Sequence, residues 1–217
     1  MKKLLIKEFK LTASPLTFLF LLFSAMTMIP GYPILVGAFF QCLSLLYTFQ
    51  FAREFGDVQY TAMLPVAKSA VVKARFLFVV TIEMMGFSLT ALLTILRMVF
   101  LSDVAVYLQN PLMNANGVFL GFWLLIFGLF NAIFVRGFFK TAFYFGKVFI
   151  YFSVAAFLLI ALAETLHHFP GLHWMGAPGF ENPLGQLLFL AASAGIYILL
   201  TWLALKKSIR SFEKIDL

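Results

Sequence analysis

The sequence predicts an all-α integral membrane protein in which residues 1–217 form a single domain with six transmembrane helices. Of these residues, 63% are hydrophobic and 12% are charged, and the mean hydropathy is +0.99. Soluble domains are about half apolar and about a quarter charged, so an ordinary soluble enzyme is excluded. Because one helical span needs about 20 apolar residues, six spans leave no room for a large catalytic domain outside the membrane.

Charged residues and Pro/Gly clusters divide the chain into six apolar runs. The expected spans are residues 15–29, 34–51, 76–101, 117–135, 148–166 and 184–205. The first run is short, and we expect it to begin nearer Thr12 or to lie in thinned bilayer. The sequence Pro-Gly-Tyr-Pro at 30–33 predicts a tight turn. We interpret the first run as an uncleaved span, because the basic segment before it is long for a signal peptide and contains Glu8.

Basic residues predict the orientation of the chain. All but one of the 16 basic residues fall in segments 1–12, 52–75, 136–147 and 206–217, and the exception is Arg97. With six spans these segments lie on the same side of the membrane, and basic segments stay in the cytoplasm. We therefore expect both termini in the cytoplasm, and we attribute the net charge of +7 to topology rather than to nucleic-acid binding.

The first 12 residues predict an amphipathic helix. At about 100° per residue, Lys3, Lys7 and Lys10 share one narrow face, and apolar residues lie on another. Such a helix lies along the inner membrane surface, with its lysines toward lipid headgroups or toward a partner protein. A basic anchor that only sets the orientation is the alternative.

Polar residues recur at helical spacing inside the second and third apolar runs. The candidates to line a translocation path are Gln41, Ser44, Thr48, Glu83 and Thr90. Small and polar residues at this spacing also let helices pack closely and hydrogen-bond. The sequence leaves both interpretations open.

Glu83 is the most informative of these positions. It lies about 12 Å into the third span, counted from Arg75 at about 1.5 Å per residue. A carboxylate inside the membrane must face the bundle interior, a partner or water. Neither Val79 nor Phe87, four residues away on either side, can pair with it. We therefore expect its partner on another helix or subunit.

Histidine and acidic residues gather around the outer end of the fifth run. They are His167, His168, His173, Glu164 and Glu181. Adjacent histidines on a helix point about 100° apart, and we expect no metal site here. The only Gly-Lys pair, at 146–147, lacks the upstream glycine of a nucleotide-binding P-loop. No common hydrolase motif occurs either, so we assign no catalytic residue.

The segment 52–73 is the longest predicted cytoplasmic loop. Its charged and large apolar residues near the start are Arg53, Glu54, Phe55, Asp57, Tyr60, Met63 and Leu64. A purely solvated loop has no need of the apolar groups, whereas a helix that docks on a cytosolic partner uses them. A helix lying on the inner leaflet is the alternative.

Four short motifs resemble those of ABC-2-type permeases, the membrane subunits of ABC exporters whose ATPase is a separate chain. They are Lys-Glu-Phe-Lys-Leu at 7–11, Arg-Glu at 53–54, Met-Leu-Pro-Val at 63–66 and Val-Val-Lys-Ala-Arg at 71–75. The resemblance covers the whole chain in length and in its six-span layout. The look-alikes are small permeases of Gram-positive bacteria, including exporters of phenol-soluble modulins, which are amphipathic peptides.

The resemblance implies the ABC-2 (ABCG-like) exporter fold in a bacterial plasma membrane. Residues 1–12, with their three lysines, would form the connecting helix. Residues 54–64 would form a coupling helix, and the seven residues named above would contact the ATPase. ATP and Mg²⁺ would bind to that partner, and this chain would have no ATPase activity, cofactor or metal of its own. A second copy or a related permease would complete a dimer that exports an apolar or amphipathic substrate, with a peptide among the candidates.

Three other functions fit the residues. A secondary transporter with Glu83 as its proton-coupling residue would work without an ATPase and respond to the proton gradient. A membrane enzyme built on the outer histidines and Glu164 would lose activity on chelation. A structural subunit would tolerate replacement of Glu83 by glutamine without a transport defect.

Overall fold

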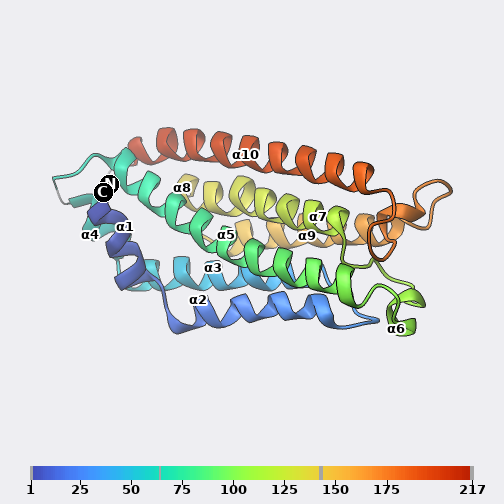
Figure 1. Ribbon diagram of the computed structural model, residues 1–217. Helices are drawn as coiled ribbons and strands as arrows, with labels where there is room; N and C mark the ends of the chain where they lie inside the picture. The colour runs from blue at the N-terminus through green and yellow to red at the C-terminus, as the bar shows by residue number, and fades with distance from the viewer. Residues whose placement is uncertain (1, 64, 142–143, 216–217) are drawn as a thin grey trace.

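The computed structural model describes residues 2–63, 65–141 and 144–215, and these residues contain helices and no strand. Figure 1 shows the long helices side by side in one elongated bundle, with α10 along one edge and α2 along the opposite edge. In chain order the helices are α1 (Lys2–Lys7), η1 (Glu8–Thr12), α2 (Pro15–Leu19), η2 (Phe20–Met28), α3 (Val36–Glu54), α4 (Asp57–Met63), α5 (Lys68–Phe100), α6 (Ala105–Leu108), α7 (Gly117–Leu129), η3 (Phe130–Val135), α8 (Arg136–Lys140), α9 (Gly146–Leu166), η4 (His173–Met175) and α10 (Pro183–Glu213).

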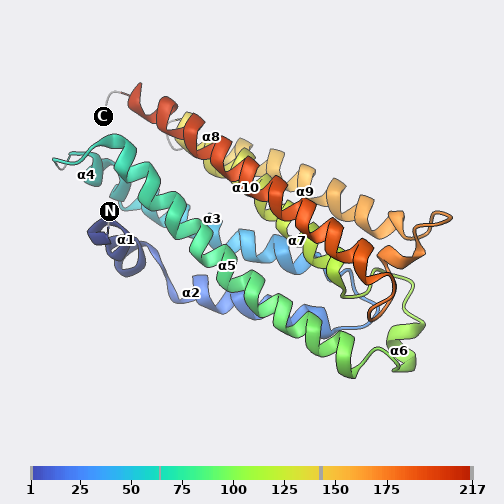
Figure 2. The ribbon, with the colours of Figure 1, turned by 45° about the horizontal axis from the view of Figure 1, so that its top comes forward.

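The N-terminal helices are sharply bent. Segments Lys3–Thr12 and Pro15–Met28 meet at 90°, and Figure 2 shows α1 turned across the end of the bundle. A proline pushes the residue before it out of the helical region, and the backbone of Ser14 is extended accordingly. The Ser14 amide donates to Thr17 Oγ1 at 3.2 Å, which helps to cap the new helix. The chain therefore begins with a short transverse segment followed by a rod that joins the bundle.

Four segments of the described chain are long and apolar enough to cross a membrane, and a fifth is obtained if the bent N-terminal pair counts as one span. The four are Lys68–Phe100, Gly117–Lys140, Gly146–Leu166 and Pro183–Glu213. The expected span 34–51 corresponds to α3, whose 19 residues include polar side chains that lower its hydropathy. These helices indicate a multi-pass membrane protein, whereas the count of six spans stays a prediction.

The segment Gly117–Lys140 forms the centre of the bundle, since 78% of its most apolar stretch is buried inside the protein. Its contact with α10 depends on Gly121, where a Cβ atom would lie 2.6 Å from a ring carbon of Phe189. A small residue at this crossing lets the two backbones approach. Large buried phenylalanines fill much of the remaining core: Phe49, Phe78, Phe119, Phe127, Phe130, Phe134, Phe138, Phe139, Phe152 and Phe212.

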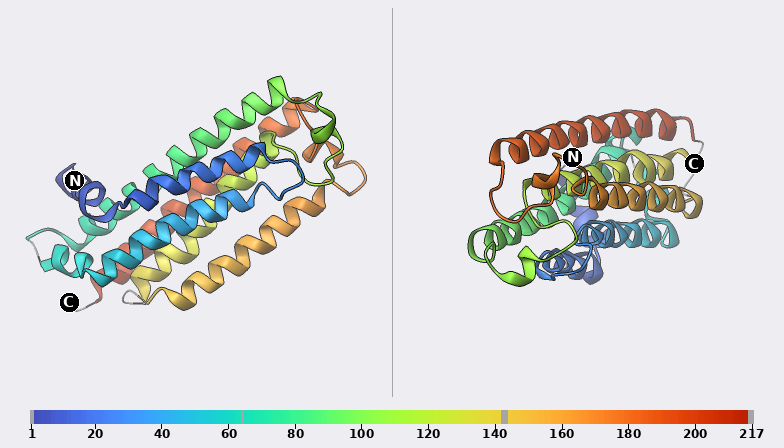
Figure 3. Two further views of the ribbon diagram at one scale, coloured as in Figure 1. Left: turned by 90° about the horizontal axis from the view of Figure 1, so that it is seen from below. Right: turned by 90° about the vertical axis from the view of Figure 1, so that its right-hand side faces the viewer.

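The two ends of the bundle differ in charge. Helices α1 and α4, the first turns of α5, the end of α8 and the end of α10 lie together at one end (Figures 1 and 3). We call it the basic end, because the expected basic segments gather there. Two helices extend past the expected spans at this end: α5 begins at Lys68 rather than at residue 76, and α10 ends at Glu213 rather than at 205. Helices α6 and η4 lie at the opposite end, which we call the far end.

Candidate functional site

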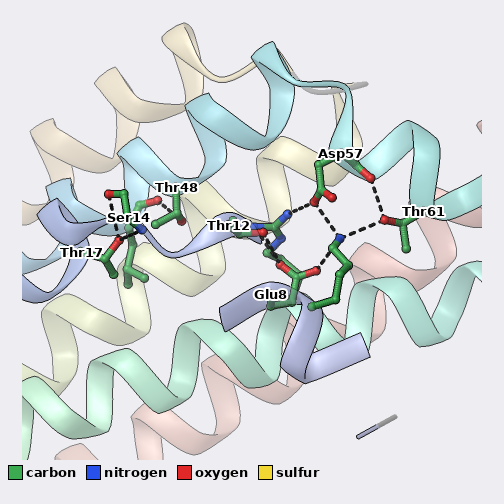
Figure 4. A network of polar contacts seen from close by, with 10 residues as sticks. Glu8, Thr12, Ser14, Thr17, Thr48, Asp57 and Thr61 are labelled. Carbon is green, nitrogen blue, oxygen red and sulfur yellow. Dashed lines mark hydrogen bonds and ion pairs between the residues drawn. The ribbon is translucent and has the colours of Figure 1, made fainter. Parts of the chain in front are cut away.

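Four charged side chains from three segments meet at the basic end. Lys7 Nζ lies 2.7 Å from Asp57 Oδ2 and 3.1 Å from Glu8 Oε1. The Arg75 guanidinium lies 3.0 Å from Glu8 Oε2 and 3.1 Å from the same Asp57 oxygen. Figure 4 shows Glu8 and Asp57 on opposite sides of the cluster, which joins η1 to α4. We call Lys7, Glu8, Asp57 and Arg75 the four-charge network.

Burial and hydrogen bonds to two threonines hold the network in one arrangement. Glu8 and Arg75 are almost fully buried, at 2% and 1% exposure. Thr12 donates to Glu8 at 3.1 Å, and the Lys7 ammonium donates to Thr61 Oγ1 at 2.9 Å. Two acids and two bases make the network neutral, but each charge depends on the others. Removing one member of a buried ion pair typically costs about 3–5 kcal/mol, because a buried charge is left without compensation.

Local sequence features bring these groups together. Residues Glu8–Thr12 form a π-helical turn, which changes the face that the chain presents after Lys7. Gly56 adopts a φ of 62°, which glycine reaches without strain, and α4 starts directly after it. Asp57 is therefore in the first turn of α4, where the helix dipole stabilises a negative charge. Arg75 lies on the inward face of α5, over the ring of Phe49 at 5.3 Å.

Exposed side chains surround the network. Phe55, Tyr60 and Met63 are 80%, 68% and 74% exposed. Arg53 is also exposed, with its guanidinium 5.3 Å from the centre of the Phe145 ring. Glu54 accepts a hydrogen bond of 3.0 Å from Gln50. The residues expected to contact an ATPase are thus divided: Asp57 lies inside the network, these five lie outside it, and Leu64 lies outside the described residues.

The bent N-terminal segment, helix α4 and the long apolar helices all lie within the residues matched by one family model. A family model described as "ABC-2 family transporter protein" matches residues 3–213. The chain belongs to this family. The resemblance to ABC-2 permeases is confirmed over nearly the whole sequence, and it indicates the membrane component of an ABC transporter. No curated protein and no solved structure matches the chain significantly, and the likeness to peptide exporters stays a prediction.

The N-terminal lysines of this ABC-2 protein do not share one environment. Lys3 and Lys10 are exposed, whereas Lys7 is turned into the four-charge network. The expected connecting helix is therefore fastened to α4 and α5 by Lys7 and Glu8. In the sequence, Glu8 argues against a signal peptide and belongs to the motif at 7–11, while Arg75 is one of the basic residues of segment 52–75; neither pattern predicts their ion pair. The pattern that could have indicated the network is Glu8, a single acid among four lysines, followed four residues later by Thr12.

The residues proposed for a translocation path are buried between helices of the ABC-2 protein. Gln41 Nε2 donates to Ser24 Oγ at 2.7 Å, and Thr90 donates to the same hydroxyl at 3.0 Å. This cluster joins α3, η2 and α5. Ser44 and Thr48 instead donate to backbone carbonyls of their own helix, at 2.8 and 2.7 Å. In this conformation the hydroxyl and amide groups take part in helix packing.

Glu83 has partners on two other helices, as the sequence predicted. Its Oε2 accepts hydrogen bonds from Tyr197 Oη at 2.7 Å and from Asn131 Nδ2 at 3.0 Å. The same amide nitrogen lies 3.1 Å from Thr201 Oγ1. Asn131 belongs to the π-helical turn η3, an irregularity often found at functional sites. Within the described part of the chain, Glu83 Oε1 and Asn131 Oδ1 have no hydrogen-bond partner.

Arg97 organises the far end. Its guanidinium donates to the carbonyl of Thr27 and to Asn114 Oδ1 and lies 4.2 Å from the centre of the Tyr107 ring. Only 3% of its surface is exposed. Arg97 therefore does not extend toward the membrane surface, because backbone and side-chain acceptors surround it inside the protein.

The Pro/Gly-rich segment after residue 170 is attached to the start of α7. Asn116 Nδ2 donates to the carbonyls of Met175 and Ala177, at 2.9 and 3.0 Å. Glu164 accepts the amide of Met113 at 2.8 Å, and His167 lies 3.2 Å from the carbonyl oxygen of Pro111. Among the described residues, the structure shows no group of three histidine, cysteine or acidic side chains placed to hold a metal.

Proposed function

We propose that this ABC-2 protein is the permease subunit of an ATP-driven exporter whose ATPase is a separate chain. The four-charge network is the observation that carries the proposal. It connects the N-terminal segment, α4 and the 33-residue helix α5 through bonds of 2.7–3.1 Å. Because α5 reaches the far end, a partner that displaces α4 would displace the longest helix with it.

The ATPase would dock on the exposed residues around the network. Phe55, Tyr60 and Met63 are large exposed side chains within the short segment 55–63 at the basic end, and large exposed apolar surface marks interaction sites. Arg53 and Glu54 would supply the charged rim of the contact. ATP and Mg²⁺ would bind to the partner chain, and its closure would pull α4 and thereby open or close the transport path.

The proposed membrane arrangement has six spans. The rod Pro15–Met28 and helix α3 lie beside the four candidate spans in the bundle (Figure 3). Counting both gives six, and the N-terminal segment and the end of α10 both lie at the basic end (Figures 1 and 2). The excess of lysine and arginine there favours the cytoplasmic side of a bacterial plasma membrane.

A complete exporter would contain two permeases. Two copies, or this chain with a related permease, would enclose a path for an apolar or amphipathic substrate, with a peptide among the candidates. For that path we retain Gln41, Ser44, Thr48, Glu83 and Thr90 as proposed polar positions. They are 0–2% exposed, so they would reach a substrate only after the helices that cover them move.

The first test is gentle purification of the tagged protein from its native membrane, followed by identification of proteins recovered in equal amount. We expect a small ABC ATPase. Met63→Glu should lower its recovery roughly tenfold or more, since a charge would enter an apolar contact. Val106→Glu, at a 56% exposed position of α6 at the far end, is the matched control and should recover the ATPase normally. Reproducible absence of an ATPase from the intact wild-type protein would refute the proposal.

A proton-coupled secondary transporter is the second candidate. The unpartnered Oε1 of Glu83, buried inside the bundle, favours it. Such a carrier would transport without any ATPase, would respond to the proton gradient and would stop working in the Glu83→Gln variant. A permease driven by ATP would continue to transport after the proton gradient is collapsed. This measurement therefore separates the two candidates.

A further inference from the structure

A groove of about 450 Å³ lies between α5 and α10, near the basic end. The side chains that decide its chemistry are Lys73 and Leu77 on α5 and Ile198, Trp202 and Leu205 on α10. Leu77, Ile198 and Trp202 are 45%, 64% and 49% exposed, so this face of the bundle is open in a single chain. From Lys73 to Val80 the groove follows α5 for about 10 Å, at about 1.5 Å per residue.

The groove is apolar along its walls and basic at one end. Lys73 is the charged side chain that lines it. Lys206 follows Trp202 by one turn of α10, and its ammonium lies 3.6 Å from the centre of the Trp202 ring. Neither lysine forms an ion pair with any residue that the structure describes, whereas Lys7 and Arg75 at the same end are fully paired. The groove therefore presents an apolar channel with Lys73 in its lining and Lys206 over the Trp202 ring, both without a carboxylate partner among the described residues.

We propose that this groove binds an anionic phospholipid, with one acyl chain along Leu77 and Trp202 and the phosphate between Lys73 and Lys206. The apolar walls match a hydrocarbon chain, which packs along them through van der Waals contacts. The two ammonium groups match a phosphate, and each basic residue near an anionic membrane surface contributes about 1 kcal/mol to binding.

Charge also argues against the other occupants of such a groove. A zwitterionic phospholipid carries the same phosphate, but its headgroup cation would lie close to the two lysines and offset the attraction. A second copy of the chain packed symmetrically on this face would bring the same lysines of both copies together, and like charges across an interface are strongly unfavourable. The anionic lipid is the occupant that satisfies both the apolar walls and the basic mouth.

Native mass spectrometry of the purified protein, together with any ATPase that stays bound, tests the proposal. Phosphatidylglycerol and phosphatidylcholine are added separately, and the lipid adducts retained per protein chain are compared. The wild type should retain phosphatidylglycerol preferentially. Lys73→Gln should weaken that binding roughly fivefold, the equivalent of about 1 kcal/mol, and should affect phosphatidylcholine binding less, because the choline cation already offsets the attraction between phosphate and lysine.

Two further variants separate the groove from its surroundings. Leu77→Trp fills the groove and should reduce the retention of both lipids. Lys147→Gln removes an exposed lysine from the start of α9, outside the groove, and should bind both lipids as the wild type does. Glycerol phosphate, added as a competitor, should displace nothing, because it carries the anion without the acyl chain.

Several results would overturn the proposal. Equal retention of the two lipids by the wild type would remove the role of charge. Unchanged phosphatidylglycerol binding in both Lys73→Gln and Leu77→Trp would place the lipid elsewhere. Displacement by glycerol phosphate would indicate a free phosphate site. A dimer that dissociates in Leu77→Trp with no change in bound lipid would assign the groove to a second copy of the chain.

Discussion

Glu8 and Arg75 form a 3.0 Å ion pair in which the two side chains are only 3% and 2% exposed. One belongs to the N-terminal transverse segment and the other to the second turn of the longest helix. A surface pair of this kind contributes little, but a buried pair makes each segment dependent on the other. The N-terminal segment is therefore an integral part of the bundle, anchored to α5 and α4 by this network.

Replacing Arg75 by methionine tests this dependence. The change keeps a long side chain but leaves the network with two acids and one base in a buried site. We expect a loss of about 3–5 kcal/mol in stability, which is measured as a clear fall in the thermal unfolding midpoint of the purified protein. Lys140→Met, at an exposed position of α8, is the control and should leave the midpoint unchanged.

The double variant Glu8→Gln with Arg75→Met provides the sharper comparison. It restores a neutral network of Lys7 and Asp57, so it should be more stable than the Arg75→Met variant alone. Strict additivity of the two single changes would contradict the ion pair.

Gly86 is predicted to be irreplaceable for steric reasons. A Cβ atom at this position would lie 2.1 Å from Gln41 Oε1, and Gln41 itself donates to Ser24. Gly86→Ala should therefore break the bond to Ser24 and destabilise the protein, despite the higher helix propensity of alanine. Gly195→Ala is the matched control, because nothing lies within 4 Å of its Cβ position. It should keep or slightly raise the thermal midpoint. Recovery in Gly86→Ala combined with Gln41→Ala would assign the defect to this contact.

Arg97 is predicted to be specific for arginine. Its planar guanidinium donates to Thr27 O and to Asn114 Oδ1 while it lies on Tyr107. A lysine ammonium cannot make both bonds in this geometry and stack at the same time. Arg97→Lys should cost about 1.5–3 kcal/mol, the usual contribution of a hydrogen bond to a charged group. Arg136→Lys, at a partly exposed position, should have no effect on the thermal midpoint.

The positions of the long helices were predictable from the sequence because they depend on local composition. Helix α9 covers Gly146–Leu166, against an expected span of 148–166. Helix α5 begins at Lys68, eight residues before the expected span, and hydropathy did not indicate this extension because residues 68–75 carry three basic side chains. Arg75 is buried there only because Glu8 and Asp57 compensate its charge.

The four-charge network could not be read from the sequence for the same reason. Its members come from the α1–η1 segment, α4 and α5, and no spacing rule connects residues on three separate segments. The sequence predicted that Glu83 has a partner on another helix or subunit, because a buried carboxylate needs a hydrogen-bond donor. It did not identify the helix that supplies this donor. Tyr197 and Asn131 became partners through the packing of α10 and η3 on α5.

Charge reversal at Glu54 tests coupling to the proposed ATPase. Glu54 is exposed at the end of α3, next to α4 but outside the four-charge network, and its hydrogen bond comes from Gln50. Glu54→Lys should therefore leave insertion and folding intact while it opposes the charge that the partner presents. We expect ATP hydrolysis by the reconstituted complex to continue while transport falls.

Gln50→Ala isolates the effect of charge in the same experiment. It removes the hydrogen bond to Glu54 but keeps the carboxylate, so ATP hydrolysis and transport should remain coupled as in the wild type. If Glu54→Lys transports normally, Glu54 has no part in coupling. If Gln50→Ala fails as Glu54→Lys does, the local structure of α3 is responsible rather than the charge. Loss of coupling in Glu54→Lys alone would place the partner's contact at this end of α3.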